Sequence, residues 1–230
     1  AILRGIPNNN FTSVTFIPTM PVATIQQVLA ALLYNIVYEL HPETAPENVV
    51  AIVGSLRPGC FFRSHPATAQ ADLVAAVGAL RPGCYFHPHS ATAQADLVAA
   101  AGALRAGCLF SPDPVTAQAV LVATVGALRP GCYFHPHPAT AQADLVAALP
   151  PGCYFAPPAI VRADLVAAVG ALRPGCYFAP YPSIAQADLV AAVGALPPRC
   201  FLSTGLRIAQ ADLVAAVGAL RPGCFFRSHP

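Results

Sequence analysis

The strongest constraint on this sequence is a cysteine that returns at an almost constant interval. Successive cysteines are separated by 24, 24, 24, 21, 23, 24 and 24 residues, and most of them have similar neighbours. Self-similarity at a short fixed period is typical of solenoids and other repeat arrays, in which stacked units bury one continuous core. The sequence therefore predicts eight equivalent positions, occupied by Cys60, Cys84, Cys108, Cys132, Cys153, Cys176, Cys200 and Cys224.

The period divides the chain into an N-terminal segment and eight repeats. The segment covers residues 1–42, and we expect a capping helix over about residues 24–39 of it. The repeats span residues 43–66, 67–90, 91–114, 115–138, 139–158, 159–182, 183–206 and 207–230. Residues 220–230 repeat residues 56–66 letter for letter, so we expect either a longer array or an end that another molecule covers, and both favour end-to-end assembly.

Each repeat begins with a helical pattern. In residues 67–90 we expect Thr68 to cap a helix of about 12 residues, with Asp72 in its first turn. Leu73, Val77 and Leu80 lie at positions i, i+4 and i+7, so they form a stripe on one helical face. In the first repeat Thr44 and Glu47 form a capping-box pattern. Small residues inside the helices predict close helix packing, with a tight contact at the recurring glycine represented by Gly78.

A turn and an extended stretch complete the repeat. Pro82 ends the helix, and Gly83 suits the positive φ of a type II turn. The apolar run that starts at Cys84 is then extended. The fold class that follows is a mainly α solenoid with one short helix, a turn and a short extended segment per repeat; an α/β solenoid is the alternative. Leucine-rich repeats share this format, but their leucine and asparagine spacing is absent here.

The fifth repeat lacks three residues of the helical pattern. Three residues are close to one helical turn of 3.6, so the deletion keeps the buried face of a helix. In a strand the same deletion would exchange the two faces.

Composition indicates self-association and argues against several partners. Hydrophobic residues make up 56% of the chain and charged residues 10%, against about 25% charged residues in typical domains. Much apolar surface must therefore be covered by other copies of the chain or by other subunits of an assembly. The basic residues are scattered, which argues against nucleic-acid binding. The longest apolar run, residues 28–37, is too short to cross a bilayer.

Two repeats place a thiol and two imidazoles within six residues. Zinc or another metal could use these side chains, but the other repeats replace the histidines, so we expect histidines in solvent-exposed loops instead. The candidate ligands are Cys84, His87, His89, Cys132, His135 and His137.

The cysteine column itself has two interpretations. A small buried hydrophobic side chain is the simpler one, and disulfides between neighbouring repeats are the alternative in an oxidising compartment. Helix-on-helix spacing would be too wide for such disulfides, whereas strand spacing would allow them.

Two further features bear on surface and compartment. Asn10 begins a glycosylation triplet, which together with the missing initiator methionine favours an extracellular location. Aromatic pairs such as Tyr85-Phe86 and Tyr133-Phe134 recur with the repeat and either pack in a column or line a groove.

These observations rank three functions. The first is a structural scaffold that self-associates or packs into a larger assembly or filament. The second is a binding module that holds a peptide, pigment or other apolar ligand on a repeated aromatic face. The third is a Cys/His carrier of metal or haem. No nucleophile, base and acid are grouped in the sequence, so we expect neither an enzyme nor a cofactor.

Overall fold

A computed structural model describes residues 2–5, 12–16, 19–31, 36–41, 43–140, 143–204 and 208–228. The chain forms two compact parts, Ala1–Thr116 and Ala117–Pro230, which we call the N-terminal and C-terminal halves. Both halves alternate helices with strands. Within the described ranges, no helix has the length and apolar content needed to cross a membrane.

The N-terminal half contains one sheet in which sequential strands are neighbours. Its strands are β1 (Ile2–Gly5), β2 (Thr12–Thr15), β3 (Ile36–Glu39), β4 (Phe61–Arg63), β5 (Tyr85–His87) and β6 (Leu109–Phe110). Its helices are α1 (Val22–Ala31), α2 (Pro46–Val53), α3 (Gln70–Ala79) and α4 (Gln94–Ala103). β1 pairs with β2 antiparallel, and every later pair is parallel.

The C-terminal half repeats the same construction. Its strands are β7 (Tyr133–Phe134), β8 (Tyr154–Phe155), β9 (Tyr177–Phe178), β10 (Phe201–Thr204) and β11 (Phe225–Ser228), all parallel. Its helices are α5 (Gln118–Gly126), α6 (Ala143–Ala147), α7 (Arg162–Gly170), α8 (Gln186–Ala195) and α9 (Gln210–Gly218), with a 3₁₀ turn, η1, at Pro138–Thr140. The repeats therefore form a solenoid-like α/β arrangement, which is the alternative form of the predicted fold.

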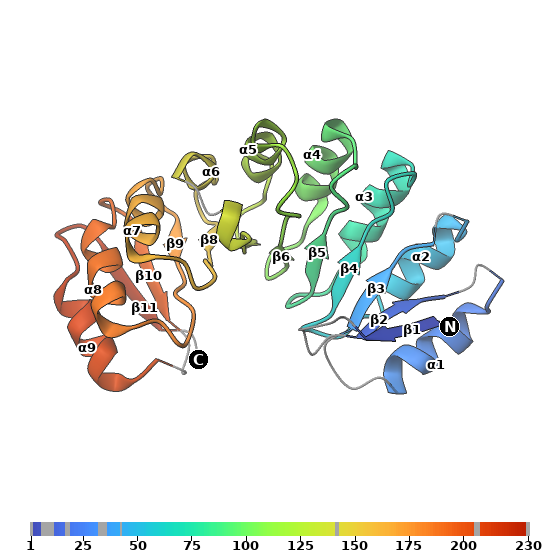
Figure 1. The fold of residues 1–230 in the computed structure, drawn as a ribbon, viewed down its shortest axis with the longest axis horizontal. Coiled ribbons are helices and arrows are strands. Elements are labelled where there is room, and N and C mark those ends of the chain that lie inside the picture. Colours follow the sequence, from blue (N-terminus) through green and yellow to red (C-terminus); the bar gives the residue numbers. More distant parts are fainter. Residues whose placement is uncertain are drawn as a thin grey trace. The chain divides into compact units, whose positions relative to one another are not determined.

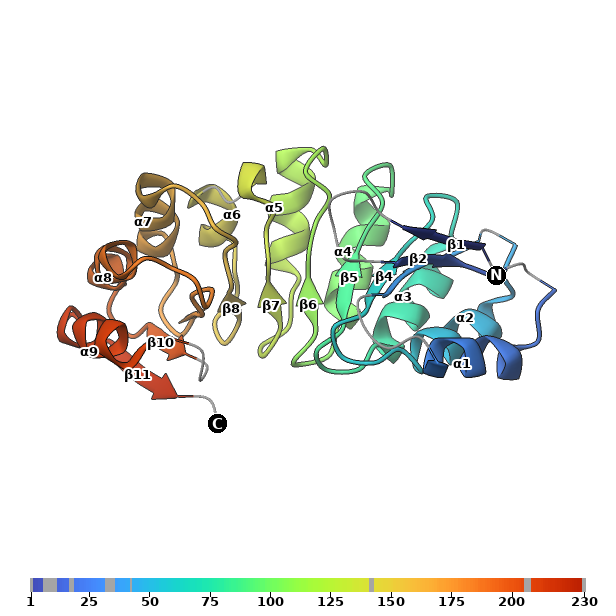
Figure 2. The ribbon, with the colours of Figure 1, turned by 60° about the horizontal axis from the view of Figure 1, so that its bottom comes forward.

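In each half the helices lie along one face of the strands, as Figure 1 and Figure 2 both show. This follows from connectivity. Strand-helix-strand crossovers are right-handed in nearly all proteins, and here each crossover leads to the next strand in the same direction. Successive helices must then fall on the same side of the sheet. The other face carries no helix of its own half in the described residues, and we call it the open face.

The core lies between the helices and the sheet. The predicted stripe of Leu73, Val77 and Leu80 is confirmed, because all three side chains are fully buried. The strands contribute a column of buried rings, in which Phe62 and Phe86 have centroids 6.1 Å apart. Equivalent residues of neighbouring repeats thus pack on one another. Truncating one such leucine to alanine typically costs about 2–5 kcal/mol.

Two turn contacts repeat along the chain. The Cys84 N–H donates to the Arg81 carbonyl at 3.1 Å, and Gly83 has a φ of +84°, as expected for the predicted turn. The Gly83 N–H donates to the carbonyl of Gly107, 2.7 Å away in the next repeat. Equivalent bonds join Gly59 to Gly83 and Gly152 to Gly175. These bonds form a second ladder of backbone hydrogen bonds at the turns, in addition to the ladder between the strands. We call it the turn ladder.

The N-terminal segment differs from the prediction. The helix expected over residues 24–39 is described over Val22–Ala31, and the prediction was wrong at its end, because Ile36–Glu39 is strand β3. Strand pairing joins Tyr38 to Phe62 and Val14 to Tyr38, so the 24-residue spacing already exists upstream of residue 43. Because Ile36 stands 24 residues before Cys60, alignment on cysteine missed this repeat.

The predicted helix caps were also wrong. Helix α3 begins at Gln70, with Ala69 as its N-cap and no side-chain cap bond, and the Thr68 hydroxyl is buried without a hydrogen-bond partner. Helix α2 likewise follows Ala45 without a side-chain cap, so Thr44 forms no capping box. The proline at the start of α2 and the acidic residue in the first turn of α2 (Glu47) and of α3 (Asp72) are present as predicted.

The predicted tight contact at Gly78 is absent as well. A Cβ atom added there would meet no heavy atom closer than 3.9 Å, which is ordinary contact.

The deletion in the fifth repeat shortens the helix and leaves the sheet register intact. Helix α6 spans only Ala143–Ala147, yet Tyr133 pairs with Tyr154 and Phe134 with Phe155. Val146 is fully buried, whereas its counterpart Val74 is partly exposed. Val146 therefore fills core space that a valine equivalent to Val77 occupies in longer repeats.

The turn ladder predicts a difference between two glycines with the same backbone conformation. Gly59 and Gly83 have φ values of +88° and +84°; an added Cβ meets nothing within 4 Å at Gly59 but lies 2.9 Å from the Pro58 Cβ at Gly83. Gly59→Ala should cost about 1 kcal/mol, and Gly83→Ala about 2–3 kcal/mol, in urea unfolding. Equal losses would show that the proline contact is unimportant.

Arg199 takes the turn position that glycine holds in the other repeats, with a φ of +64°. A left-handed conformation costs about 1–2 kcal/mol for a residue with a side chain. Arg199→Gly should therefore stabilise the chain by about 0.5–1 kcal/mol after the entropy of glycine is subtracted. Arg199→Ala is the control, because it removes the same side chain and keeps the strain. A gain in thermal stability for both variants would contradict the strain explanation.

Candidate functional site

The aromatic pairs of the sequence are divided between the two faces of the sheet. Phe86 is fully buried against the helices, whereas Tyr85, the residue before it, lies on the open face and is partly exposed. The same alternation is present at Tyr133-Phe134 and Tyr177-Phe178. In these three pairs one member packs in a core column, and the other is partly exposed at the open face. Tyr154-Phe155 differs, because Tyr154 is only 8% exposed.

On the open face of the C-terminal half, the aromatic side chains stack on one another. Ring centroids are 4.3, 4.4, 4.6 and 5.2 Å apart between successive members. This ring column consists of Tyr133, Tyr154, Tyr177, Phe201 and Phe225. The Arg227 guanidinium lies 6.0 Å from the Tyr177 ring centroid, within cation–π range. Burial raises the pKa of Tyr133 and of Tyr154.

Small side chains lie beside the ring column. Two residues after Tyr154 and Tyr177 on the same face come Ala156 and Ala179, which carry no charge and little bulk. The equivalent positions after Tyr133, Phe201 and Phe225 hold His135, Ser203 and Arg227. Covering such a surface requires the desolvation of few polar groups.

The N-terminal half has a shorter aromatic stack and a polar row. Phe61 and Tyr85 stack at 4.1 Å. Beside them, Arg63 contacts Glu39 at 3.5 Å and His87 Nε2 at 3.1 Å. The His87 Nδ1 lies 2.8 Å from the Ser111 carbonyl, so it carries the proton, and Nε2 accepts from Arg63. The two open faces therefore differ: one is polar and bonded internally, and the other is mainly aromatic.

The cysteine column lies at the base of the strands. The thiols of Cys84, Cys153 and Cys200 each donate to a turn carbonyl of the preceding repeat at 3.2 Å. All eight cysteines are among the described residues and form no disulfide, and every one except Cys224 is buried. Burial raises the pKa of Cys84 and of Cys153 to about 12. These thiols act as packing groups and hydrogen-bond donors, and they are poor nucleophiles at neutral pH.

The six candidate metal ligands do not come together. Cys84 is buried on the helix side of β5, whereas His87 lies on the open face and His89 follows the strand. Cys132, His135 and His137 alternate in the same way. Burial lowers the pKa of His135, whose Nδ1 donates to the Ala156 carbonyl at 2.7 Å. Among the described side chains, no three metal-ligating residues are grouped closely enough to hold an ion.

Sequence reasoning missed one group of residues, and one candidate cannot be placed. Asn10 lies outside the described residues. The missed group is the recurrence of histidine at positions 41, 65 and 89, each 24 residues after the last. The 24-residue interval was visible in the sequence, but only the strand register shows that the three histidines follow neighbouring strands at equivalent positions.

No model of a known protein family matches the chain, and no curated protein is detectably similar to it in sequence. Function must therefore be inferred from the geometry of the two halves.

The buried thiols generate a test with a thiol reagent. At pH 8 the folded protein should react rapidly at Cys224 and slowly at the other seven cysteines, because those are buried. In denaturing guanidinium chloride all eight should react rapidly. The free energy of unfolding should also fall as pH rises from about 9 towards 12. Thiols of the unfolded chain ionise at lower pH than that of folded Cys84, whose pKa burial raises to about 12. Eight rapid reactions in the folded protein, or a rapid phase that survives Cys224→Ser, would contradict the burial.

Proposed function

We propose that this chain is a non-catalytic repeat scaffold that self-associates through the open face of its C-terminal half. The observation that carries the proposal is the ring column on a parallel sheet face without helices. Parallel sheets are normally covered on both faces, because their strands are apolar on both sides. A second protein surface would supply the missing cover.

The chemistry of this face supports a protein partner of similar character. Stacked aromatic rings offer a large apolar area, and aromatic residues are enriched at the centres of protein interfaces. Arg227 brings a charge to the face of Tyr177, and Ala156 and Ala179 bring none. Two such faces can meet without burying several unpaired charges, which favours a second copy of the chain as the partner.

A second candidate function rests on a shallow hollow at one end of the ring column. It has a volume of about 510 Å³ and is lined by Pro174, Gly175, Arg199, Phe201 and Phe225. An apolar side chain of an extended peptide would fit there beside the rings. In that case the chain would act as a binding module while remaining monomeric.

Sedimentation velocity over a concentration series tests the scaffold proposal. The unmodified chain should sediment above its monomer mass of 23.7 kDa as concentration rises. The double variant Tyr177→Ser/Phe201→Ser should weaken association at least tenfold, as expected for interface aromatics. Val161→Ser is the matched control, since Val161 is 66% exposed in the loop before α7.

Two results would overturn the scaffold proposal. One is a monomer at every concentration, and the other is equal association by the double variant and the unmodified chain, with circular dichroism confirming the fold of both. A monomer that binds an apolar peptide, and loses this binding with Phe201→Ser, would support the second candidate.

A further inference from the structure

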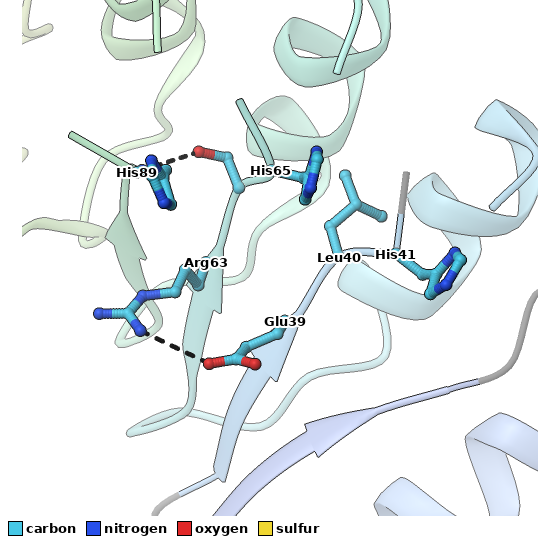
Figure 3. Close-up of a pocket in the computed structure, with 7 residues that line it drawn as sticks. Glu39, Leu40, His41, Arg63, His65 and His89 are labelled. Carbon is cyan, nitrogen blue, oxygen red and sulfur yellow. Dashed lines mark hydrogen bonds and ion pairs between the residues drawn. The ribbon is translucent and has the colours of Figure 1, made fainter. Parts of the chain in front are cut away.

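A pocket in the N-terminal half lies far along the sequence from the ring column and has a different chemistry. It has a volume of about 370 Å³ and lies where β3 and β4 end. Its lining includes Glu39, Arg63, Ser64 and three histidines, His41, His65 and His89 (Figure 3). Carboxyl ends of parallel strands are the usual ligand-binding edge of α/β sheets, and helix N-termini, with their positive dipole ends, lie at the same edge.

The hydrogen bonds of the three histidines fix their tautomers. In each, Nδ1 accepts the backbone N–H of the residue two positions later, at 3.3 Å for His41, 3.1 Å for His65 and 3.1 Å for His89. A neutral imidazole that accepts at Nδ1 carries its proton on Nε2. Each ring therefore brings one N–H donor to the pocket wall.

The other polar groups of the pocket are also mainly donors. The Arg63 guanidinium has five N–H groups and is held by Glu39 and His87. Ser64 is 3% exposed, and its hydroxyl accepts the His89 backbone N–H at 3.1 Å, which leaves the hydroxyl proton to donate. Glu39 is the one carboxylate in the wall, and its contact with Arg63 compensates its charge.

The spacing of adjacent strands suits an oxyanion better than a metal ion. Equivalent atoms of adjacent strands are about 4.8 Å apart, whereas two nitrogen ligands of a tetrahedral zinc ion are about 3.3 Å apart. Donors that bond different oxygens of one phosphate group are about 5 Å apart. Several donors in one wall at this spacing are the pattern expected for binding phosphate oxygens.

We propose that this pocket binds a phosphate group through the Nε2–H groups of His65 and His89, which follow adjacent strands, together with Arg63 and Ser64. The ligand is either free inorganic phosphate or a compact phosphomonoester. This site is independent of self-association through the C-terminal half.

Titration of the full chain with inorganic phosphate, and separately with phosphoserine, tests the proposal. Imidazole Cε1–H resonances in NMR spectra should shift saturably, and the probe that binds more tightly identifies the source of the phosphate. His65→Asn should raise the apparent Kd about tenfold, because it removes one donor. An asparagine can still accept the turn N–H, as Asp113 does for Val115 at 3.0 Å. Glu39→Gln should lower the Kd severalfold.

Matched controls come from the repeats themselves. His137→Asn alters the same repeat position outside the pocket and should leave the Kd unchanged. If His65→Asn fails to fold, Arg63→Gln replaces it, with His137→Asn again as the control. Absence of saturable shifts with both probes, or equal effects of pocket and control variants, would overturn the proposal.

Discussion

Every repeat of this chain depends on the one beside it for both apolar cover and hydrogen-bond partners. A helix of 10 residues such as α3 is marginal in water alone. A strand of two or three residues cannot exist without a paired neighbour. Stacking of repeats 24 residues apart supplies both the apolar cover and the hydrogen-bond partners. It buries Leu73, Val77 and Leu80, and it places the turn amide of Gly83 against the carbonyl of Gly107.

The same stacking leaves one face of the sheet in each half without helices. Residues at equivalent positions of successive repeats lie side by side across the strands, and we call each such set a row. Rows differ in chemistry because the substitutions between repeats are concentrated outside the core. In the C-terminal half, one row is a column of stacked rings that begins at Tyr133. In the N-terminal half, rows at the strand ends hold Arg63, His65 and their neighbours. A uniform core thus supports two surfaces of different character, which we propose bind a protein and a phosphate group.

The repeat, the helical stripe and the Pro82-Gly83 turn could be predicted because they depend on local periodicity and on the conformations open to proline and glycine. The sheet was harder to predict, since a run of two apolar residues does not distinguish a strand from an irregular extended segment. The run that ends in Val37 was assigned to a helix because it is mostly apolar, yet β3 begins at Ile36, within its last two residues. The phosphate pocket joins residues from separate repeats, so only the strand register brings them together.

Amide hydrogen exchange of the turn residues tests most directly whether neighbouring repeats support each other. The N–H groups of Gly59, Gly83, Gly152 and Gly175 donate to the next repeat at 2.7–2.8 Å, although they lie in turns at the edge of the fold. Stacked repeats predict that these amides are protected to the same degree as those of the paired strands. Exchange at the rate of an open turn, with the helices still protected, would contradict the account.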